Sequence, residues 1–152
     1  MRLFQAADTL ALTGLTRSQL REWSGRGRRH LVSPDVEPEG PGRHALYAWQ
    51  TILVLRLLNT LHSEFAMEVG SWAPAMTDLR HKLDRISFPS LWRSIVHFPN
   101  RGHADLLIAM SEVPPEGGIV LPLNPHLAIL ATKLSLPPPD QLPLFPAMAV
   151  QP

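Results

Sequence analysis

The sequence of 152 residues contains no cysteine. This absence excludes disulfides, thiolate metal sites and cysteine nucleophiles, and it fits a reducing compartment. Long apolar segments are also missing: Asp8 and Thr9 interrupt the N-terminal one, and the charge-free residues 117–132 include Pro122 and Pro125. Both segments are too short for a signal peptide or for a membrane span of ~20 residues. We therefore expect a cytoplasmic protein with no membrane partner.

Sequence motifs of catalytic and cofactor-binding sites are missing as well. The chain has no glycine-rich phosphate loop, no His-Glu-x-x-His helix and no Gly-x-Ser-x-Gly turn. His97, His103 and Asp105 come nearest to a titratable cluster, but their spacing matches no metal or acid–base motif. The sequence therefore predicts neither an enzyme nor a bound metal or cofactor.

Charge and proline are distributed unevenly along the chain. The formal net charge of +1 gives no general attraction to nucleic acid, yet residues 1–30 hold six arginines against two carboxylates. Three prolines lie within residues 1–73 and thirteen within residues 74–152. An apolar fraction of 45% is ordinary for a folded protein. These asymmetries predict a basic N-terminal part and a proline-rich C-terminal part.

Two short helices are predicted at the start of the basic part. Phe4, Ala7 and Leu10 recur at helical spacing, and Gly14 ends that pattern as a C-terminal glycine does. Thr16 is a favourable N-cap for the second helix. Two short helices joined by a tight turn match the spacing of a helix-turn-helix, in which the second helix can enter the DNA major groove.

The second predicted helix has an apolar face and a basic face. Trp23 lies on the apolar face, where an indole is expected to be buried, whereas Arg17 and Arg21 lie one turn apart on another side. The planar guanidinium group of arginine can donate two hydrogen bonds at once to guanine. Arg17, Ser18 and Arg21 are therefore candidates for contacts with DNA base edges, and Thr16 is a supporting donor.

After the second helix, glycine, proline and arginine replace the helical pattern. Residues 31–32 and 45–47 predict two short strands around a turn-rich segment, as in an exposed hairpin or wing. Residues 48–69 contain neither glycine nor proline and are apolar on most sides, which predicts one long core helix. The basic residues that precede the first strand are expected to follow the DNA phosphates; these are Arg26, Arg28, Arg29 and His30.

Residues 3–72 resemble the MerR family, the winged helix-turn-helix regulators named for mercury resistance. The resemblance rests on the segments Leu20-Arg21-Glu22-Trp23, Gly27, Leu31-Val32-Ser33-Pro34, Gly42-Arg43 and Leu46-Tyr47-Ala48-Trp49. It implies that Arg43 and the Tyr47 hydroxyl hold phosphate from the wing, and that the protein is a homodimer. A two-fold dimer presents two recognition helices one DNA turn apart, ~34 Å, which predicts a pseudo-palindromic site.

Residues 73–136 are expected to form a small α+β module for dimerisation, ligand response or a protein contact. Asn124 is the expected N-cap of its last helix. The predicted elements are a helix over residues 74–86, a short helix over 88–96, strands over 103–110 and 119–123, and a final helix over 124–134.

Residues 137–152 form a proline-rich tail, whose composition favours an extended polyproline conformation. Its apolar residues Leu142, Leu144 and Phe145 either dock onto a protein surface or belong to a loose tail. The predicted fold is thus mainly α with short β elements: a winged helix-turn-helix head over residues 1–72, an α+β module over 73–136 and the tail.

Two functions are compatible with these features. The leading hypothesis is a sequence-specific transcriptional regulator that binds double-stranded DNA as a homodimer. The alternative is an antitoxin-like or adaptor protein whose C-terminal half and tail bind a partner protein. The salt dependence of DNA binding distinguishes the two, because arginines that neutralise phosphates make affinity fall steeply as salt rises.

Overall fold

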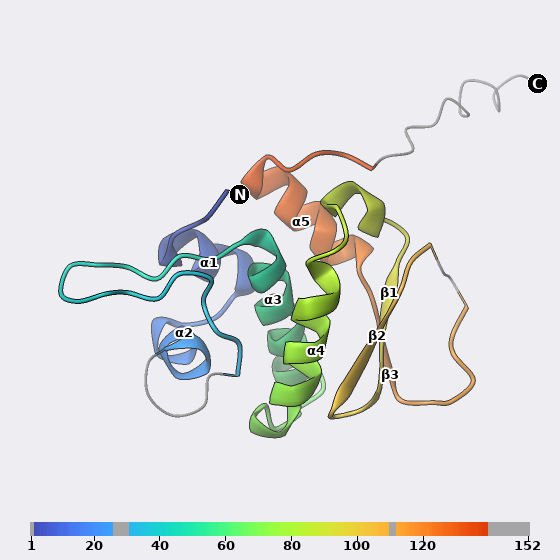
Figure 1. Cartoon of the computed structure of the whole chain (residues 1–152). Helices are drawn as coiled ribbons and strands as arrows, with labels where there is room; N and C mark the ends of the chain where they lie inside the picture. Colours follow the sequence, from blue (N-terminus) through green and yellow to red (C-terminus); the bar gives the residue numbers. More distant parts are fainter. Residues whose placement is uncertain (1, 26–30, 110–111, 140–152) are drawn as a thin grey trace, which may run out of the picture.

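Five α-helices and a three-stranded antiparallel sheet make up the part of the chain that the structure, a computed structural model, describes (Figure 1). That part comprises residues 2–25, 31–109 and 112–139. The mixed content agrees with the predicted mainly α class with short β elements. The elements are α1 (Ala6–Thr13), α2 (Arg17–Ser24), α3 (Trp49–Ser63), α4 (Ala73–Leu83), β1 (Ile95–Asn100), β2 (His103–Leu107), β3 (Ile119–Pro122) and α5 (Asn124–Leu134), with short 3-10 helices at Gly70–Trp72 and Phe88–Leu91.

Helix α3 lies at the centre of the molecule (Figure 1). It contacts α1, α4 and α5, and its apolar side chains are fully buried on several sides, as the sequence predicts. The N-terminal helices lie on one side of α3, whereas α4 and the sheet lie on the other (Figure 1). One hydrophobic core extends from Phe4 to Leu134, across the boundary predicted after residue 72.

The sheet has the order β2-β1-β3 and packs against α4 through β2. The prediction of a helix over residues 88–96 is wrong, because the 3-10 helix ends at Leu91 and Ile95 begins the central strand β1. Val96 and Phe98 belong to the hydrophobic core, whereas His97 between them meets Asp105 on the other side. Only an extended chain sends alternate side chains to opposite faces.

Helix α3 ends earlier than the sequence predicts. Its last residue is Ser63 rather than residue 69. Ala66 has a φ of 53°, in the left-handed region, and the Met67 N–H donates to the Leu61 carbonyl at 3.0 Å. This turn closes the helix before Phe65 can extend its buried face, and the Phe65 side chain is 48% exposed.

The segment between α2 and α3 pairs differently from the predicted wing. Residues 31–32 form no strand; instead, the N–H groups of Leu31 and Val32 both donate to the carbonyl of Trp23. Leu46 forms an isolated β-bridge with Val36. We call residues 36–46 the hairpin segment. It projects from the N-terminal side of the molecule, away from the sheet (Figure 1).

The start of α5 also differs in detail. Asn124 is the first residue of this helix, and Leu123 is the N-cap, so the predicted capping role of Asn124 is wrong. The Asn124 side chain accepts a hydrogen bond from the Arg93 N–H at 2.7 Å. It therefore ties α5 to the chain that leads into β1, a use of the amide that no local pattern indicates.

Candidate nucleic-acid interface

The start of α2 is fixed by its own sequence. The Thr16 hydroxyl accepts from the Gln19 N–H at 3.1 Å, and the Gln19 side-chain carbonyl accepts from the Thr16 N–H at 3.0 Å. This reciprocal capping box satisfies two backbone donors at the helix start. Leu20 and Trp23 anchor the inner face of the helix, with 5% and 3% of their surface exposed.

Replacing Thr16 with alanine is expected to lower the free energy of unfolding by ~0.5–2 kcal/mol, because the N-cap acceptor is lost. Urea denaturation followed by circular dichroism measures this loss. Ser18→Ala is the matched control, since Ser18 also carries an exposed hydroxyl on α2 but does not cap the helix. Equal losses in the two variants would contradict the capping role.

The outer face of α2 is exposed at the predicted positions. Arg17, Ser18 and Arg21 are all exposed, and so is Thr16. Arg17 and Arg21 also line a hollow of about 180 Å³ between α2 and the hairpin segment. The opposite wall of this hollow includes Pro34, Glu37, Pro38 and Ala45. The basic face of α2 and the hairpin segment therefore border one shared depression on the surface.

Of the two predicted wing residues, only Arg43 is exposed. Tyr47 is 4% exposed, and its backbone forms a β-bridge with Phe4. Burial raises the pKa of the Tyr47 phenol, while the nearby Ser24 hydroxyl acts in the opposite direction. Tyr47 is thus largely buried and joins the end of the hairpin segment to Phe4, and it also lines the hollow beside α2. The phosphate contact that the resemblance implies for it stays a prediction.

Several predicted contact residues lie outside the residues that the structure describes. They are the DNA-binding candidates Arg26, Arg28, Arg29 and His30, and the partner-binding candidates Leu142, Leu144 and Phe145.

The turn between α1 and α2 is held by polar residues of α3 that the sequence reasoning missed. Arg56 donates from Nη1 to the Leu12 carbonyl, and from Nε to Nδ1 of His126 at 2.9 Å. Asn59 donates to the Thr13 carbonyl at 2.8 Å. These donors occupy carbonyls at the negative end of α1, which its own backbone leaves without partners. The available signal was two polar residues, three apart, within the leucine-rich middle of the helix.

Burial changes the titration of this group of side chains. It lowers the pKa of Arg56, and burial together with the Arg56 charge lowers the pKa of His126 to about 4. A neutral imidazole can accept the hydrogen bond from Arg56, whereas an imidazolium cannot. The geometry and the titration therefore agree that His126 is neutral at pH 7.

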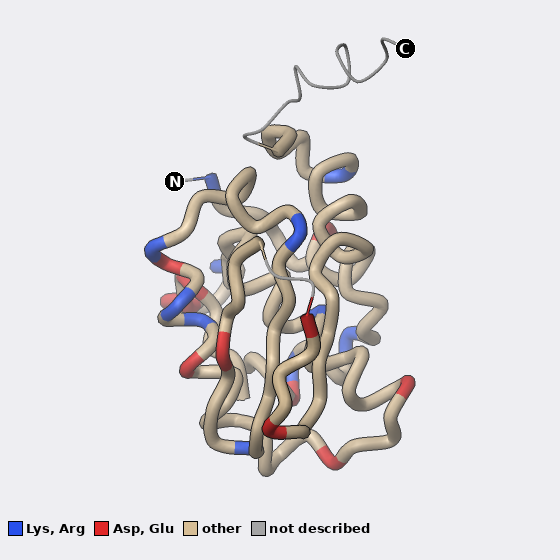
Figure 2. Tube along the Cα trace, turned by 90° about the vertical axis from the view of Figure 1, so that its right-hand side faces the viewer, with Lys and Arg blue, Asp and Glu red and all other residues tan. Residues whose placement is uncertain are grey.

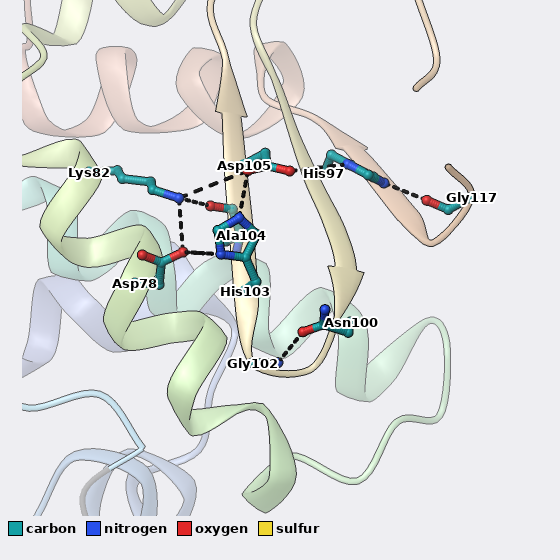
Figure 3. Close-up of polar contacts among 9 residues, drawn as sticks. All are labelled: Asp78, Lys82, His97, Asn100, Gly102, His103, Ala104, Asp105 and Gly117. Atoms are coloured by element: carbon teal, nitrogen blue, oxygen red, sulfur yellow. Dashed lines mark hydrogen bonds and ion pairs between the residues drawn. The ribbon is translucent and has the colours of Figure 1, made fainter. Parts of the chain in front are cut away.

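A second polar group lies between α4 and the sheet (Figure 3). Lys82 donates to Asp78 at 2.9 Å and to the Ala104 carbonyl at 2.6 Å. His103 lies 3.2 Å from Asp78 and 2.8 Å from Asp105. Burial acts to raise the pKa of the Asp78 carboxyl, but hydrogen bonds from the Ala104 N–H and from Lys82 outweigh it, and the pKa of Asp78 is lowered. These contacts hold α4 against β2.

His97, His103 and Asp105, which have no motif spacing, do converge in space (Figure 3). His97 Nδ1 lies 3.5 Å from Asp105, and its Nε2 contacts the Gly117 carbonyl. The Lys82 ammonium, 4.0 Å from Asp105, places a cation beside these groups. Within residues 2–25, 31–109 and 112–139, no group of three or more histidine and carboxylate side chains is arranged to hold a metal ion.

Comparison with known proteins gives no assignment. No family model matches the chain, and no curated protein is significantly similar to it in sequence. The resemblance of residues 3–72 to the MerR family therefore stays a prediction. In the part of the chain that the structure describes, no helix combines the length and apolar character needed to cross a membrane.

Proposed function

We propose that the protein is a transcriptional regulator that binds double-stranded DNA in a sequence-specific manner, as a homodimer on a pseudo-palindromic site. The observation that carries this proposal is the arrangement of α2. Its inner face is anchored in the core by Leu20 and Trp23, and its outer face exposes Arg17, Ser18 and Arg21 beside the hairpin segment. A rigid helix with exposed arginines next to a projecting segment suits insertion into a DNA groove.

The residues divide into two roles. Arg17 and Arg21, one helical turn apart, are placed to read base edges, since each guanidinium can donate two parallel hydrogen bonds to guanine. Arg43 on the hairpin segment is placed to contact phosphate, which adds affinity without sequence preference. Fixing Thr16 and Gln19 in the capping box holds the start of α2 rigid, so the arginines reach a groove from a defined position.

The proposal is tested by fluorescence anisotropy of labelled duplex DNA over a salt series. Affinity is expected to fall linearly on a log–log plot, with a slope of ~0.9 for each phosphate neutralised. Selection of bound duplexes from a random pool is expected to enrich a palindrome. A flat salt response, or a pool without an enriched sequence, would count against the proposal.

The double variant Arg17→Ala, Arg21→Ala is expected to bind the selected duplex ~10–100-fold more weakly than the unaltered protein does. Its affinity for unrelated duplexes is expected to fall much less. The matched control is Arg85→Ala with Lys133→Ala. It removes one exposed cation just after α4 and one exposed cation on α5. An equal loss of affinity in the control would mean that only the overall charge matters, and the assignment of α2 would be wrong.

A further inference from the structure

The loop that joins β2 to β3 has the opposite charge to the outer face of α2. Residues 102–132 contain three carboxylates, Asp105, Glu112 and Glu116, and no lysine or arginine. The loop from β2 to β3 carries only acidic charges on the side shown in Figure 2. The negative charge of this loop favours a cationic ligand over an anionic one.

A hollow of about 470 Å³ lies between the sheet and the loop that joins β2 to β3. The strands contribute His97, Pro99, Asp105 and Leu107 to its lining, and the loop contributes residues 112–116. Its volume is within the ~300–1,000 Å³ that is usual for sites of small organic ligands. Val113 on the loop is 72% exposed, an unusual placement for a valine.

The carboxylates of the hollow differ in how they are paired. Asp105 is contacted by His97, His103 and Lys82, so its carboxylate already has partners within the fold. Glu112 and Glu116 are exposed, and neither forms an ion pair with a residue that the structure describes. The hollow therefore combines two unpaired negative charges with the apolar surface of leucine, valine and proline.

We infer that this hollow binds an organic cation, specifically a protonated amine or a guanidinium group on an aliphatic chain. The cationic head pairs with Glu112 and Glu116, and the aliphatic chain covers Leu107 and Val113. Such ligands bury their methylene groups on apolar surface while the charged head stays near water and its counter-charge. Binding here does not depend on the proposed DNA interface, which lies at the other side of the molecule (Figure 1).

The test uses the full-length protein without DNA and three probes of equal chain length: hexylammonium, hexanoate and hexanol. Isothermal titration calorimetry and methyl NMR follow binding. We expect saturable binding of hexylammonium that shifts the methyl resonances of Leu107 and Val113, with hexanol at least about fivefold weaker and hexanoate weaker still. Absence of saturable hexylammonium binding, or equal binding of hexanoate, would overturn the inference.

Paired variants separate local pairing from overall charge. Glu112→Gln with Glu116→Gln is expected to weaken hexylammonium binding about fivefold or more. Glu39→Gln with Glu64→Gln makes the same change in net charge at exposed positions outside the hollow, and is expected to change affinity less than about twofold. Equal weakening by the two pairs would contradict the site.

A further comparison identifies the source of the cation. The blocked tripeptide Gly-Lys-Gly presents an alkylammonium group of four carbons from a peptide backbone, and butylammonium is the free amine of equal chain length. Tighter binding of the tripeptide than of butylammonium supports a lysine or arginine side chain of a protein as the occupant, and the reverse order supports a free amine. If both bind equally well to the Glu112→Gln, Glu116→Gln variant and to the unaltered protein, the hollow is not the site.

Discussion

Replacing Trp23 with alanine is expected to lower the free energy of unfolding by ~3–5 kcal/mol. The Trp23 side chain is 3% exposed and meets the His62 ring edge to face, with the ring centroids 5.6 Å apart. Its carbonyl accepts the N–H groups of Leu31 and Val32. Removing the indole leaves a cavity where α2 and the following segment meet α3, so the loss comes from packing at the base of the proposed interface.

Urea denaturation and the DNA anisotropy titration together measure this effect. Glu22→Ala is the neighbouring control on the exposed face of α2 and is expected to change stability by less than ~0.5 kcal/mol. DNA affinity is expected to fall in Trp23→Ala although no DNA contact is removed, because α2 loses its anchor. A stability loss below ~1 kcal/mol would show that α2 is not held by this side chain.

Replacing Arg56 with leucine is expected to cost ~2–4 kcal/mol of stability. The leucine retains apolar contact with the core, but the Leu12 carbonyl and His126 Nδ1 both lose their donor. A buried acceptor without a partner carries its full desolvation cost. The measurement is again urea denaturation, and Arg85→Leu, at an exposed site on the same protein, is expected to be nearly neutral.

The same contact predicts a pH dependence. Because the pKa of His126 is about 4 in the folded protein and ~6.5 in an unfolded chain, the unfolded state binds the extra proton between these values. Stability due to His126 is therefore constant above pH ~6.5, falls as the pH decreases towards 4, and then levels off. The expected loss is ~1–2 kcal/mol after allowance for partial contact with solvent.

Variants isolate this contribution from the carboxylates that titrate at lower pH. The pH profile of His126→Gln is expected to be flatter than that of the unaltered protein between pH 6.5 and 4. In Arg56→Leu, removal of the cation raises the pKa of His126, so its share of the acid-induced loss shrinks. Identical profiles for the unaltered protein and His126→Gln would mean that His126 is protonated equally easily in both states.

The elements that the sequence predicted well are those with local start and stop chemistry. Gly14 ends α1 in the left-handed conformation, with a φ of 77°, and Thr16 begins α2 with a complete capping box. Pro74 lies in the first turn of α4. Each feature depends on residues within four positions along the chain, so no knowledge of the rest of the fold is needed to recognise it.

The elements that the sequence misplaced depend on contacts between distant residues. The apolar run that contains Ile95 and Val96 has no feature that distinguishes a buried strand from a helix, and its strand conformation follows from pairing with β2 on one side and β3 on the other. Helix α3 ends without glycine or proline. Asn124 resembles an N-cap residue in the sequence, but its side-chain oxygen accepts a hydrogen bond from the N–H of Arg93, thirty-one positions away.

In the candidate site, the sequence predicted the exposed residues of α2 but not the contacts between distant residues. Arg17, Ser18 and Arg21 are exposed because the apolar residues of α2 fix which side faces the core, and helical spacing then determines the other side. The burial of Tyr47 was not predictable in this way, because it depends on the bridge to Phe4, forty-three positions earlier. The roles of Arg56 and His126 likewise require the packing of α3 on α1 and α5.

The central position of α3 has a consequence during synthesis of the protein. Its buried surface is covered by α1 from the beginning of the chain and by α5 from near its end. A polypeptide that is still on the ribosome, with α5 not yet made, leaves part of that apolar surface in water and lacks the Arg56 contact with His126. A product of early termination before residue 124 therefore exposes apolar surface of the kind that chaperones and proteases recognise.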